Sequence, residues 1–130
     1  MTHITGIDHV ALTVSNADAS AAFYSELLGA SEAIRHDDDT VSVRVLSGNG
    51  FLLGLRQYHH YDHDRFSEFR TGMDHVAFGI ADVAAFNHFE EVLVRLGAPY
   101  TPACETPIGS VLVFRDPDGI QGEIFLPASE

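Results

Sequence analysis

The chain has no lysine, no tryptophan and a single cysteine, Cys104, among its 130 residues. The absence of lysine excludes catalysis through a lysine Schiff base. One cysteine cannot form an internal disulfide, so we expect a reducing, cytoplasmic location and a small buried role for Cys104. No apolar run approaches the ~18 residues of a membrane span. The first residues lack the basic and apolar segments of a secretory signal.

Positive charge is also scarce, because the seven basic residues face 19 acidic ones and the formal net charge is −12. Nucleic acids and anionic membranes require clustered cations, so we expect neither as a partner. The hydrophobic content of 45% is ordinary for a globular protein. We therefore predict one domain over residues 1–130.

One hexapeptide occurs twice. Residues 6–11 read Gly-Ile-Asp-His-Val-Ala and residues 72–77 read Gly-Met-Asp-His-Val-Ala, a match at five of six positions. Such self-similarity indicates duplication of one supersecondary unit. We predict a first module over about 6–57, a connection over 58–71 and a second module over about 72–127.

Hydrophobic periodicity predicts the same order of elements in both modules. In the first module we expect a strand, a helix and three strands at residues 7–14, 18–28, 30–35, 40–46 and 51–57. In the second we expect a strand at 73–80, a helix beginning after the N-cap Asp82, an extended piece at 99–102, and strands at 110–114 and 120–126. The predicted fold class is α+β, with two tandem βαβββ modules.

Overlaying the modules reveals a set of metal-ligand positions. The turn glycines Gly50 and Gly119 correspond, and the fourth residue after each is Gly54 or Glu123. Together with the repeated histidines this gives four positions, of which His9, His75 and Glu123 fill three. Two imidazoles and a carboxylate form the ligand set of non-haem Fe(II) oxygenases. We predict a divalent metal there, Fe²⁺ or Mn²⁺ first, with Ni²⁺, Co²⁺ or Zn²⁺ as alternatives.

Three motifs together resemble the vicinal oxygen chelate superfamily. They are the repeated Gly-x-Asp-His-Val-Ala, the helix end Phe23-Tyr24-x-x-Leu27-Leu28-Gly29, and residues 114–123, Phe-Arg-Asp-Pro-Asp-Gly-x-x-x-Glu. This superfamily includes glyoxalase I, extradiol dioxygenases, methylmalonyl-CoA epimerase, fosfomycin-resistance thiol transferases and bleomycin-binding proteins. The resemblance implies a cupped mixed sheet around a divalent metal held by His9, His75 and Glu123, often within a homodimer.

Departures from the subfamilies favour some reactions over others. Glyoxalase I uses a second carboxylate at the position of Gly54, so proton-shuttling isomerisation lacks its base here. Fosfomycin enzymes bind a phosphonate with cationic side chains, which the absence of lysine disfavours. The best prediction is ring-cleaving dioxygenase chemistry on a small aromatic or vicinal-oxygen substrate. The alternatives are a glyoxalase-like lyase, a thiol transferase, or a non-catalytic protein that binds a drug.

Further candidates lie outside the ligand set. In the tract 58–63, Tyr58 and His60 could supply an acid–base group; a second metal site and a polar surface linker are the alternatives. Arg44 corresponds to Val113 by the repeat, which places it either in the cup or exposed at a sheet edge. Arg115 is expected to be solvated. The predicted substrate contacts are Arg44, Ala11, Leu52 and Val113.

Overall fold

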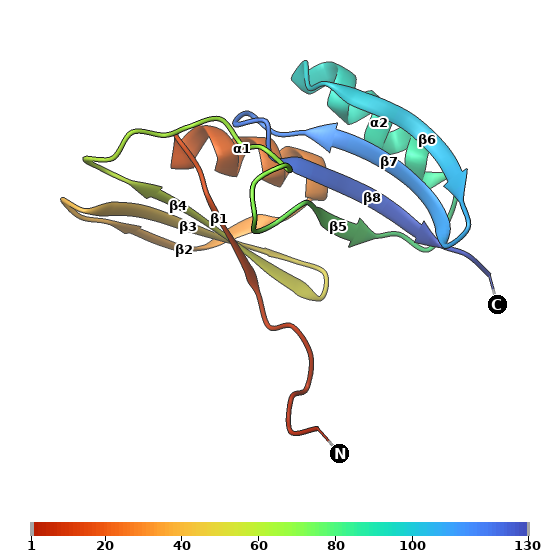
Figure 1. Cartoon of the computed structure of the whole chain (residues 1–130), viewed down its shortest axis with the longest axis horizontal. Helices are drawn as coiled ribbons and strands as arrows, with labels where there is room; N and C mark the ends of the chain where they lie inside the picture. The colour runs from red at the N-terminus through yellow and green to blue at the C-terminus, as the bar shows by residue number, and fades with distance from the viewer. Residues whose placement is uncertain (1, 130) are drawn as a thin grey trace. The chain divides into compact units, whose positions relative to one another are not determined.

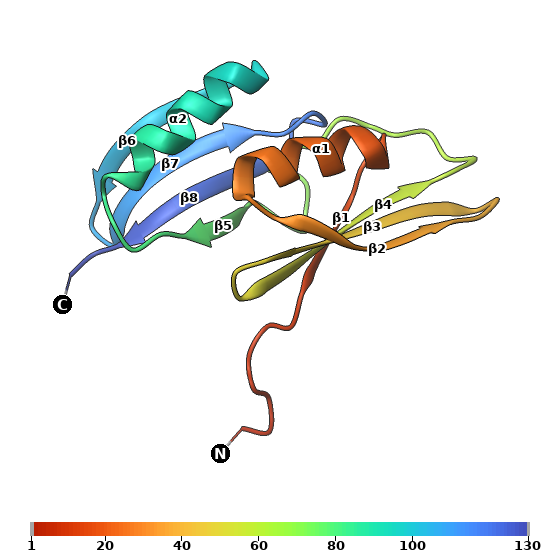
Figure 2. The same ribbon diagram turned by 180° about the vertical axis from the view of Figure 1, so that it is seen from behind.

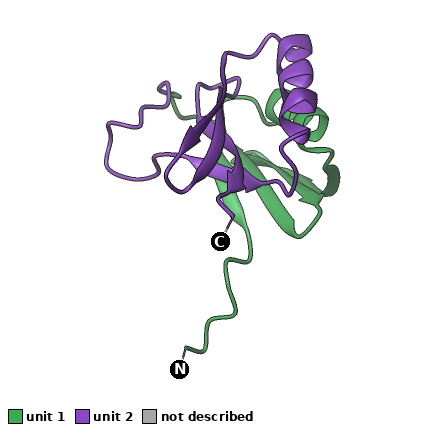
Figure 3. Cartoon of the chain, turned by 90° about the vertical axis from the view of Figure 1, so that its right-hand side faces the viewer, with its two compact units in different colours: residues 1–63 green, residues 64–130 purple. Residues whose placement is uncertain are grey.

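The structure is a computed structural model that describes residues 2–129. It divides into two compact units, residues 1–63 (unit 1) and residues 64–130 (unit 2), coloured green and purple in Figure 3. Each unit contains one copy of the hexapeptide and one βαβββ succession of elements. The predicted α+β class with two βαβββ modules is therefore confirmed.

Unit 1 combines a four-stranded mixed sheet with one helix (Figures 1 and 2). Its elements are β1 (Val10–Thr13), α1 (Ala17–Leu28), β2 (Ser31–Asp37), β3 (Val41–Gly48) and β4 (Phe51–Tyr58). The sheet order is β1-β4-β3-β2. The β1–β4 pairing is parallel, and the other two pairings are antiparallel.

Unit 2 repeats this arrangement, and α2 lies against its sheet in both views of the ribbon (Figures 1 and 2). Its elements are β5 (Val76–Gly79), α2 (Ala85–Leu96), β6 (Tyr100–Thr106), β7 (Gly109–Arg115) and β8 (Gln121–Pro127). The sheet order is β5-β8-β7-β6, again with a parallel pairing between the first and last strands. The duplication seen in sequence is thus a duplication of sheet topology.

The helix covers one face of each sheet. In unit 1 this covered face carries side chains that are at most 3% exposed: Leu12, Leu46, Leu53 and Leu55. Burying each of them contributes ~1.5–3 kcal/mol. Because strand residues alternate between faces, the residues between them point the other way. That second face, the open face, carries Ala11, Thr13 and Gly54 in unit 1, and Ala77, Val113 and Glu123 in unit 2.

The helix ends follow from short-range chemistry. Asn16 is the N-cap of α1, and its side-chain oxygen accepts the Ala19 N–H at 3.0 Å. Gly29 and Gly97 close the two helices in the left-handed region. The predicted N-cap Asp82 is wrong for α2, because Ala84 is the N-cap and Asp82 instead accepts the Ala84 N–H in the preceding turn. Among residues 2–129, no helix has the length and apolarity needed to cross a membrane.

Both parallel strands are shorter than the predicted 7–14 and 73–80. The ladder to β4 begins at Val10 and the ladder to β8 begins at Val76. His9 and His75 therefore lie directly before their strands, where the chain leaves the sheet.

The prediction for Cys104 is wrong, because its side chain is exposed. Cys104 lies on the edge strand β6, which pairs only with β7, beside a register shift between Thr101 and Cys104. Such a bulge interrupts the alternation of faces from which burial is read.

Candidate metal centre

His75 and Glu123 meet on the open face of unit 2. Glu123 pairs with Ala77 in the parallel β5–β8 ladder, two residues after His75. The His75 Nε2 and a Glu123 carboxylate oxygen lie 3.4 Å apart. Glu123 is only 17% exposed, whereas His75 is 40% exposed. The second module thus brings two of its predicted ligands together unaided.

A carboxylate engages the other ring nitrogen of both histidines. Asp74 lies 2.6 Å from Nδ1 of His75, and Asp8 lies 2.7 Å from Nδ1 of His9. A carboxylate can only accept, so the short aspartate contact places the proton of the neutral ring on Nδ1 and leaves the Nε2 lone pair free; in His75, Nε2 faces the second carboxylate, that of Glu123, at the longer distance of 3.4 Å. Metal-binding histidines in proteins commonly have this outer contact, which fixes ring orientation and tautomer. The aspartate in each hexapeptide is therefore part of the candidate site.

In unit 2 the aspartate that contacts the histidine is itself held by further hydrogen bonds. Gln121 Nε2 donates to Asp74 Oδ1 at 3.1 Å, and Arg115 Nη2 donates to Gln121 Oε1 at 3.1 Å. Arg115 also forms a two-pronged ion pair with Glu68 at 3.0 and 3.1 Å. These contacts lower the pKa of Glu68 and raise that of Arg115. Arg115 is paired rather than solvated, so that prediction is wrong.

Gly54 occupies the fourth position of the ligand overlay. It pairs with Ala11 in the parallel β1–β4 ladder, as Glu123 pairs with Ala77. The equivalence of Gly54 and Glu123 drawn from the turn glycines is therefore correct. A Cβ placed at Gly54 would lie 3.3 Å from the Ala11 Cβ, so the two strands approach closely here.

The donor chemistry fits a first-row divalent metal, since it offers two imidazole Nε2 atoms and one carboxylate. Among residues 2–129 no group of three or more His, Cys, Asp or Glu side chains is gathered for a metal ion. His75 and Glu123 form a pair within unit 2, and His9, 60% exposed, belongs to unit 1.

Tyr58 and His60, the two predicted acid–base residues in and after β4, lie in different surroundings. Tyr58 is half-buried, and its hydroxyl accepts the Arg56 Nε–H at 3.0 Å. It borders an open hollow of about 480 Å³ lined by Thr13, Thr40, Tyr58, Tyr61, Asp62 and His63. His60 is exposed with a φ of 67°, and its Nε2 lies 3.0 Å from the Asp39 carbonyl oxygen. His60 does not line the hollow.

Arg56 was missed by sequence reasoning. It pairs with Thr13 on β1 and lies two residues from Gly54 on β4, so all three share the open face. Arg56 is half-buried, and its guanidinium carbon lies 5.7 Å from the centre of the Tyr58 ring. Within the described part of unit 1, no carboxylate forms an ion pair with it. Arg56 therefore offers a positive charge on the face that carries Ala11.

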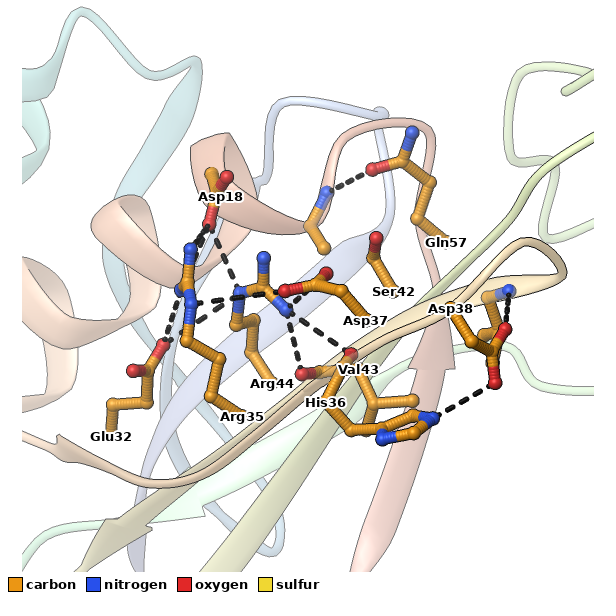
Figure 4. Close-up of polar contacts among 12 residues, drawn as sticks. Asp18, Glu32, Arg35, His36, Asp37, Asp38, Ser42, Val43, Arg44 and Gln57 are labelled. Carbon is orange, nitrogen blue, oxygen red and sulfur yellow. Dashed lines mark hydrogen bonds and ion pairs between the residues drawn. The ribbon is translucent and has the colours of Figure 1, made fainter.

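Arg44 lies elsewhere, inside an ion-pair cluster shown in Figure 4. It is 3% exposed; its Nε donates to Asp18 at 3.0 Å and its Nη1 to Asp37 at 2.9 Å. Burial lowers the pKa of Arg44, but the bonds to Asp37 and Asp18 outweigh that effect and raise it. The exposed alternative is excluded, and these contacts tie β3 to α1 and β2.

The face of Arg44 also corrects its predicted equivalence with Val113. Arg44 pairs with Leu55 on the covered face, whereas Val113 pairs with Glu123 on the open face. Counted from the turn glycines, the two hairpins differ in register by one residue. Leu46, four residues before Gly50, pairs with Leu53, whereas Phe114, five residues before Gly119, pairs with the equivalent residue Gly122. A one-residue slip reverses every side chain. Of the predicted substrate contacts, only Ala11, Leu52 and Val113 lie on open faces.

The residues missed from sequence fall into two kinds. The repeat itself contained a signal for Asp8 and Asp74, because an aspartate precedes the histidine in both copies. Glu68 had no such signal, since 47 residues separate it from its partner Arg115.

Comparison with known proteins shows the family of the chain. A sequence model of the Glyoxalase/Bleomycin resistance protein/Dioxygenase superfamily matches residues 6–124. The chain therefore belongs to this superfamily.

Individual relatives include enzymes and resistance proteins. Metallothiol transferase FosB of Shouchella clausii is 29% identical over 119 residues, which cover 89% of this chain and 76% of FosB. A glyoxylase/bleomycin resistance protein/dioxygenase domain from Frankia sp. EAN1pec is 36% identical with a TM-score of 0.91, covering 96% of this chain and 99% of that one. A point mutant of the fosfomycin resistance protein FosX of Listeria monocytogenes, solved with Mn(II) and 1S,2S-dihydroxypropylphosphonic acid, shares the fold. Its TM-score is 0.74, with 20% identity, over 94% of this chain and 92% of FosX.

Proposed function

We propose that this protein is a divalent-metal-dependent enzyme whose metal is held by His9, His75 and Glu123. The observation that carries the proposal is the pair of imidazoles whose Nδ1 atoms are each taken by a neighbouring aspartate, with Glu123 facing one free Nε2. When bound, the metal would act as a Lewis acid toward two adjacent oxygens of a small substrate. We propose Mn²⁺ first and Fe²⁺ second.

The proposed reaction is opening of an epoxide by addition of a thiol, on a substrate that carries an anionic group: a C–S bond would form, a ring C–O bond would break, and the thiol proton would end on the released oxygen. Similarity to the metallothiol transferase FosB supports this class over the others. Arg56 supports it too, as a half-buried cation without a carboxylate partner in unit 1. Arg56 would bind the anionic group of the substrate, and the small side chains Ala11 and Thr13 would leave it room on the open face.

Metal analysis of protein purified without chelator tests the site. We expect about one equivalent of Mn²⁺ or Fe²⁺ per chain, and loss of the metal in His75→Ala. A thiol-consumption assay with L-cysteine and fosfomycin then tests the reaction, and Arg56→Met should weaken apparent substrate affinity without removing the metal. A metal-loaded protein that consumes no thiol would retain the site and refute the addition chemistry.

Ring-cleaving dioxygenase chemistry is the second candidate, because the proposed donor set is that of the Fe(II) oxygenases. Catechol-dependent uptake of O₂ by Fe²⁺-loaded protein would favour it over addition. A non-catalytic drug-binding role would instead leave ligand affinity unchanged in both chelator-treated protein and His9→Ala.

We also propose a homodimer. Whether the three ligands come from one chain or two copies is tested by mixing His9→Ala with His75→Ala under conditions that exchange subunits. Recovered metal binding means that each site takes ligands from both copies. No recovery means that each chain completes its own site.

A further inference from the structure

An unbroken chain of polar contacts runs through unit 2 from a half-buried ion pair to a candidate metal ligand. It passes from Glu68 to Arg115, Gln121, Asp74 and His75, and no step within it exceeds 3.1 Å. His75 Nε2 then faces Glu123 at 3.4 Å. All of these residues belong to unit 2, so the chain does not depend on unit 1.

Gln121 is the link that gives the chain a direction. Its amide oxygen accepts from Arg115, which has only donors, so its NH₂ group must face Asp74. The same Nε2 lies 3.4 Å from the backbone oxygen of Asp74. Asp74 is 63% exposed and would otherwise sample several rotamers in water. The amide therefore holds an exposed carboxylate against the imidazole.

Arg115 in turn is held in place by more than Gln121. Its Nη1 also donates to the backbone oxygen of Gly119 at 3.1 Å, and both prongs of its guanidinium contact Glu68. A two-pronged arginine–carboxylate pair is geometrically specific. Because the Arg115 guanidinium is held by these contacts, it fixes the orientation of the Gln121 amide.

The first module lacks this support. In the matched hairpins, Ser47 pairs with Leu52 where Arg115 pairs with Gln121. Asp8 is 86% exposed, and its polar contact among residues 2–63 is His9. The two histidines have the same inner contact, but within the described part of its own unit only His75 has an outer one.

From this asymmetry we infer that Gln121 is a positioning residue for His75. Held by the Arg115–Glu68 pair, it fixes Asp74, and Asp74 fixes the His75 tautomer with Nδ1 protonated and Nε2 free. His75 and Glu123 then form a preorganised half of the metal site, which His9 completes. The consequence for metal affinity rests on the proposed function, whereas the orientation of His75 does not.

The direct test is the ring tautomer of His75 in metal-free protein, observed by two-bond ¹H–¹⁵N NMR at about pH 9, where free imidazoles are neutral. The variants are Gln121→Leu, which introduces the residue of the first module, and Gln121→Glu, which keeps an acceptor for Arg115 but places a carboxylate against Asp74. Gln57→Leu is the matched control: it removes one hydrogen bond, from Ala17 N–H at 2.9 Å, in unit 1.

We expect the Nδ1–H form of His75 to predominate in the wild type and to lose population in both Gln121 variants. We expect Mn²⁺ affinity to fall about tenfold in Gln121→Leu, the scale of outer-contact mutations at metal sites. Gln57→Leu should change neither quantity.

An unchanged His75 tautomer in both Gln121 variants would overturn the inference, even if metal affinity fell, because the loss would not pass through the imidazole. A tautomer shift in the Gln121 variants of a protein that binds neither Mn²⁺ nor Fe²⁺ would support the positioning role and refute the proposed metal function.

Discussion

The two modules share one topology but differ in the number of side-chain contacts that support their candidate metal ligands. Each places a histidine before its first strand and an aspartate on the ring Nδ1. Only unit 2 adds a facing carboxylate, Glu123, and the Gln121–Arg115–Glu68 support. The repeat therefore supplies equivalent positions in both copies, and the second copy has more of the candidate ligands and of the contacts that support them.

In the first module, a cluster of charged side chains stabilises the fold. Its buried arginine, Arg44, ties α1 and β2 to the sheet through Asp18 and Asp37. In the corrected register, the corresponding residue of unit 2 is Leu112, which is fully buried and pairs with Ile124 as Arg44 pairs with Leu55. One copy is stabilised by ion pairs where the other is stabilised by apolar packing.

The largest expected effect comes from Glu123→Gly. This substitution removes the one carboxylate of the proposed donor set and gives both modules a glycine at the equivalent positions 54 and 123. We expect Mn²⁺ affinity, measured by electron paramagnetic resonance titration, to fall by at least ~100-fold, since direct ligands matter more than outer contacts. His88→Ala, on the exposed side of α2, should leave affinity unchanged. Retained affinity in Glu123→Gly would remove Glu123 from the site.

The next test compares the two histidines. Because His75 is braced and already faces Glu123, His75→Ala should weaken Mn²⁺ binding about tenfold more than His9→Ala does. Titration of both variants under one buffer condition measures the ratio. Equal losses would mean that the outer contacts of unit 2 have no bearing on affinity.

Replacing the buried arginine by the residue of the other copy should have a moderate effect. Arg44→Leu removes the ion pairs but introduces an apolar side chain on a covered face that accepts leucine in unit 2. The freed carboxylates of Asp18 and Asp37 are at least half-exposed and can be solvated. We expect unfolding free energy to fall by about 1–2 kcal/mol in urea denaturation. A loss similar to that of a large core truncation would contradict this balance.

Low pH should reduce the folding stability of unit 1. Bonds from Arg44 lower the pKa of Asp18; bonds from Ser42 and then Arg44 lower that of Asp37; and His36, with two backbone N–H groups, lowers that of Asp38 to about 2. A depressed folded-state pKa gives stability that is present above the ordinary value of 3.8 and is lost as pH falls below it.

Amide hydrogen exchange between about pH 4 and pH 2 checks this expectation, because it reports each unit separately. In unit 1 the pKa values of Asp18, Asp37 and Asp38 are lowered from 3.8, and in unit 2 that of Glu68 is lowered from 4.5. Unit 1 should therefore lose protection as pH falls through this range. Simultaneous loss in both units would show that they unfold together.

The smallest effect is expected at Gly54, the residue of unit 1 that corresponds to Glu123. Gly54→Ala places a Cβ 3.3 Å from that of Ala11, which requires only a small shift of the strands. We expect a change in unfolding free energy within about 1 kcal/mol and metal affinity within about twofold of wild type. A large loss of metal in this variant would indicate that the open backbone at Gly54 belongs to the site.

Much of the architecture was predictable, because strand and helix periods are local properties of the chain. The order of elements followed from hydrophobic periodicity, the equivalence of Gly54 with Glu123 followed from the spacing after the turn glycines, and the superfamily was suggested by the resemblance of three motifs. The lengths of the parallel strands and the exposure of Cys104 did not, since they depend on where pairing partners end and where a bulge falls.

The sequence by itself determined that His9 and His75 occupy equivalent positions of a duplicated unit and that Glu123 corresponds to Gly54, because a sequence repeat preserves the alternation of faces along each strand. Only the tertiary structure decided the face of Arg44, since one residue of hairpin register reverses a side chain. It alone also revealed the bracing of His75. Glu68 and Arg115, like Asp74 and Gln121, are 47 residues apart, and only folding brings them within hydrogen-bond distance.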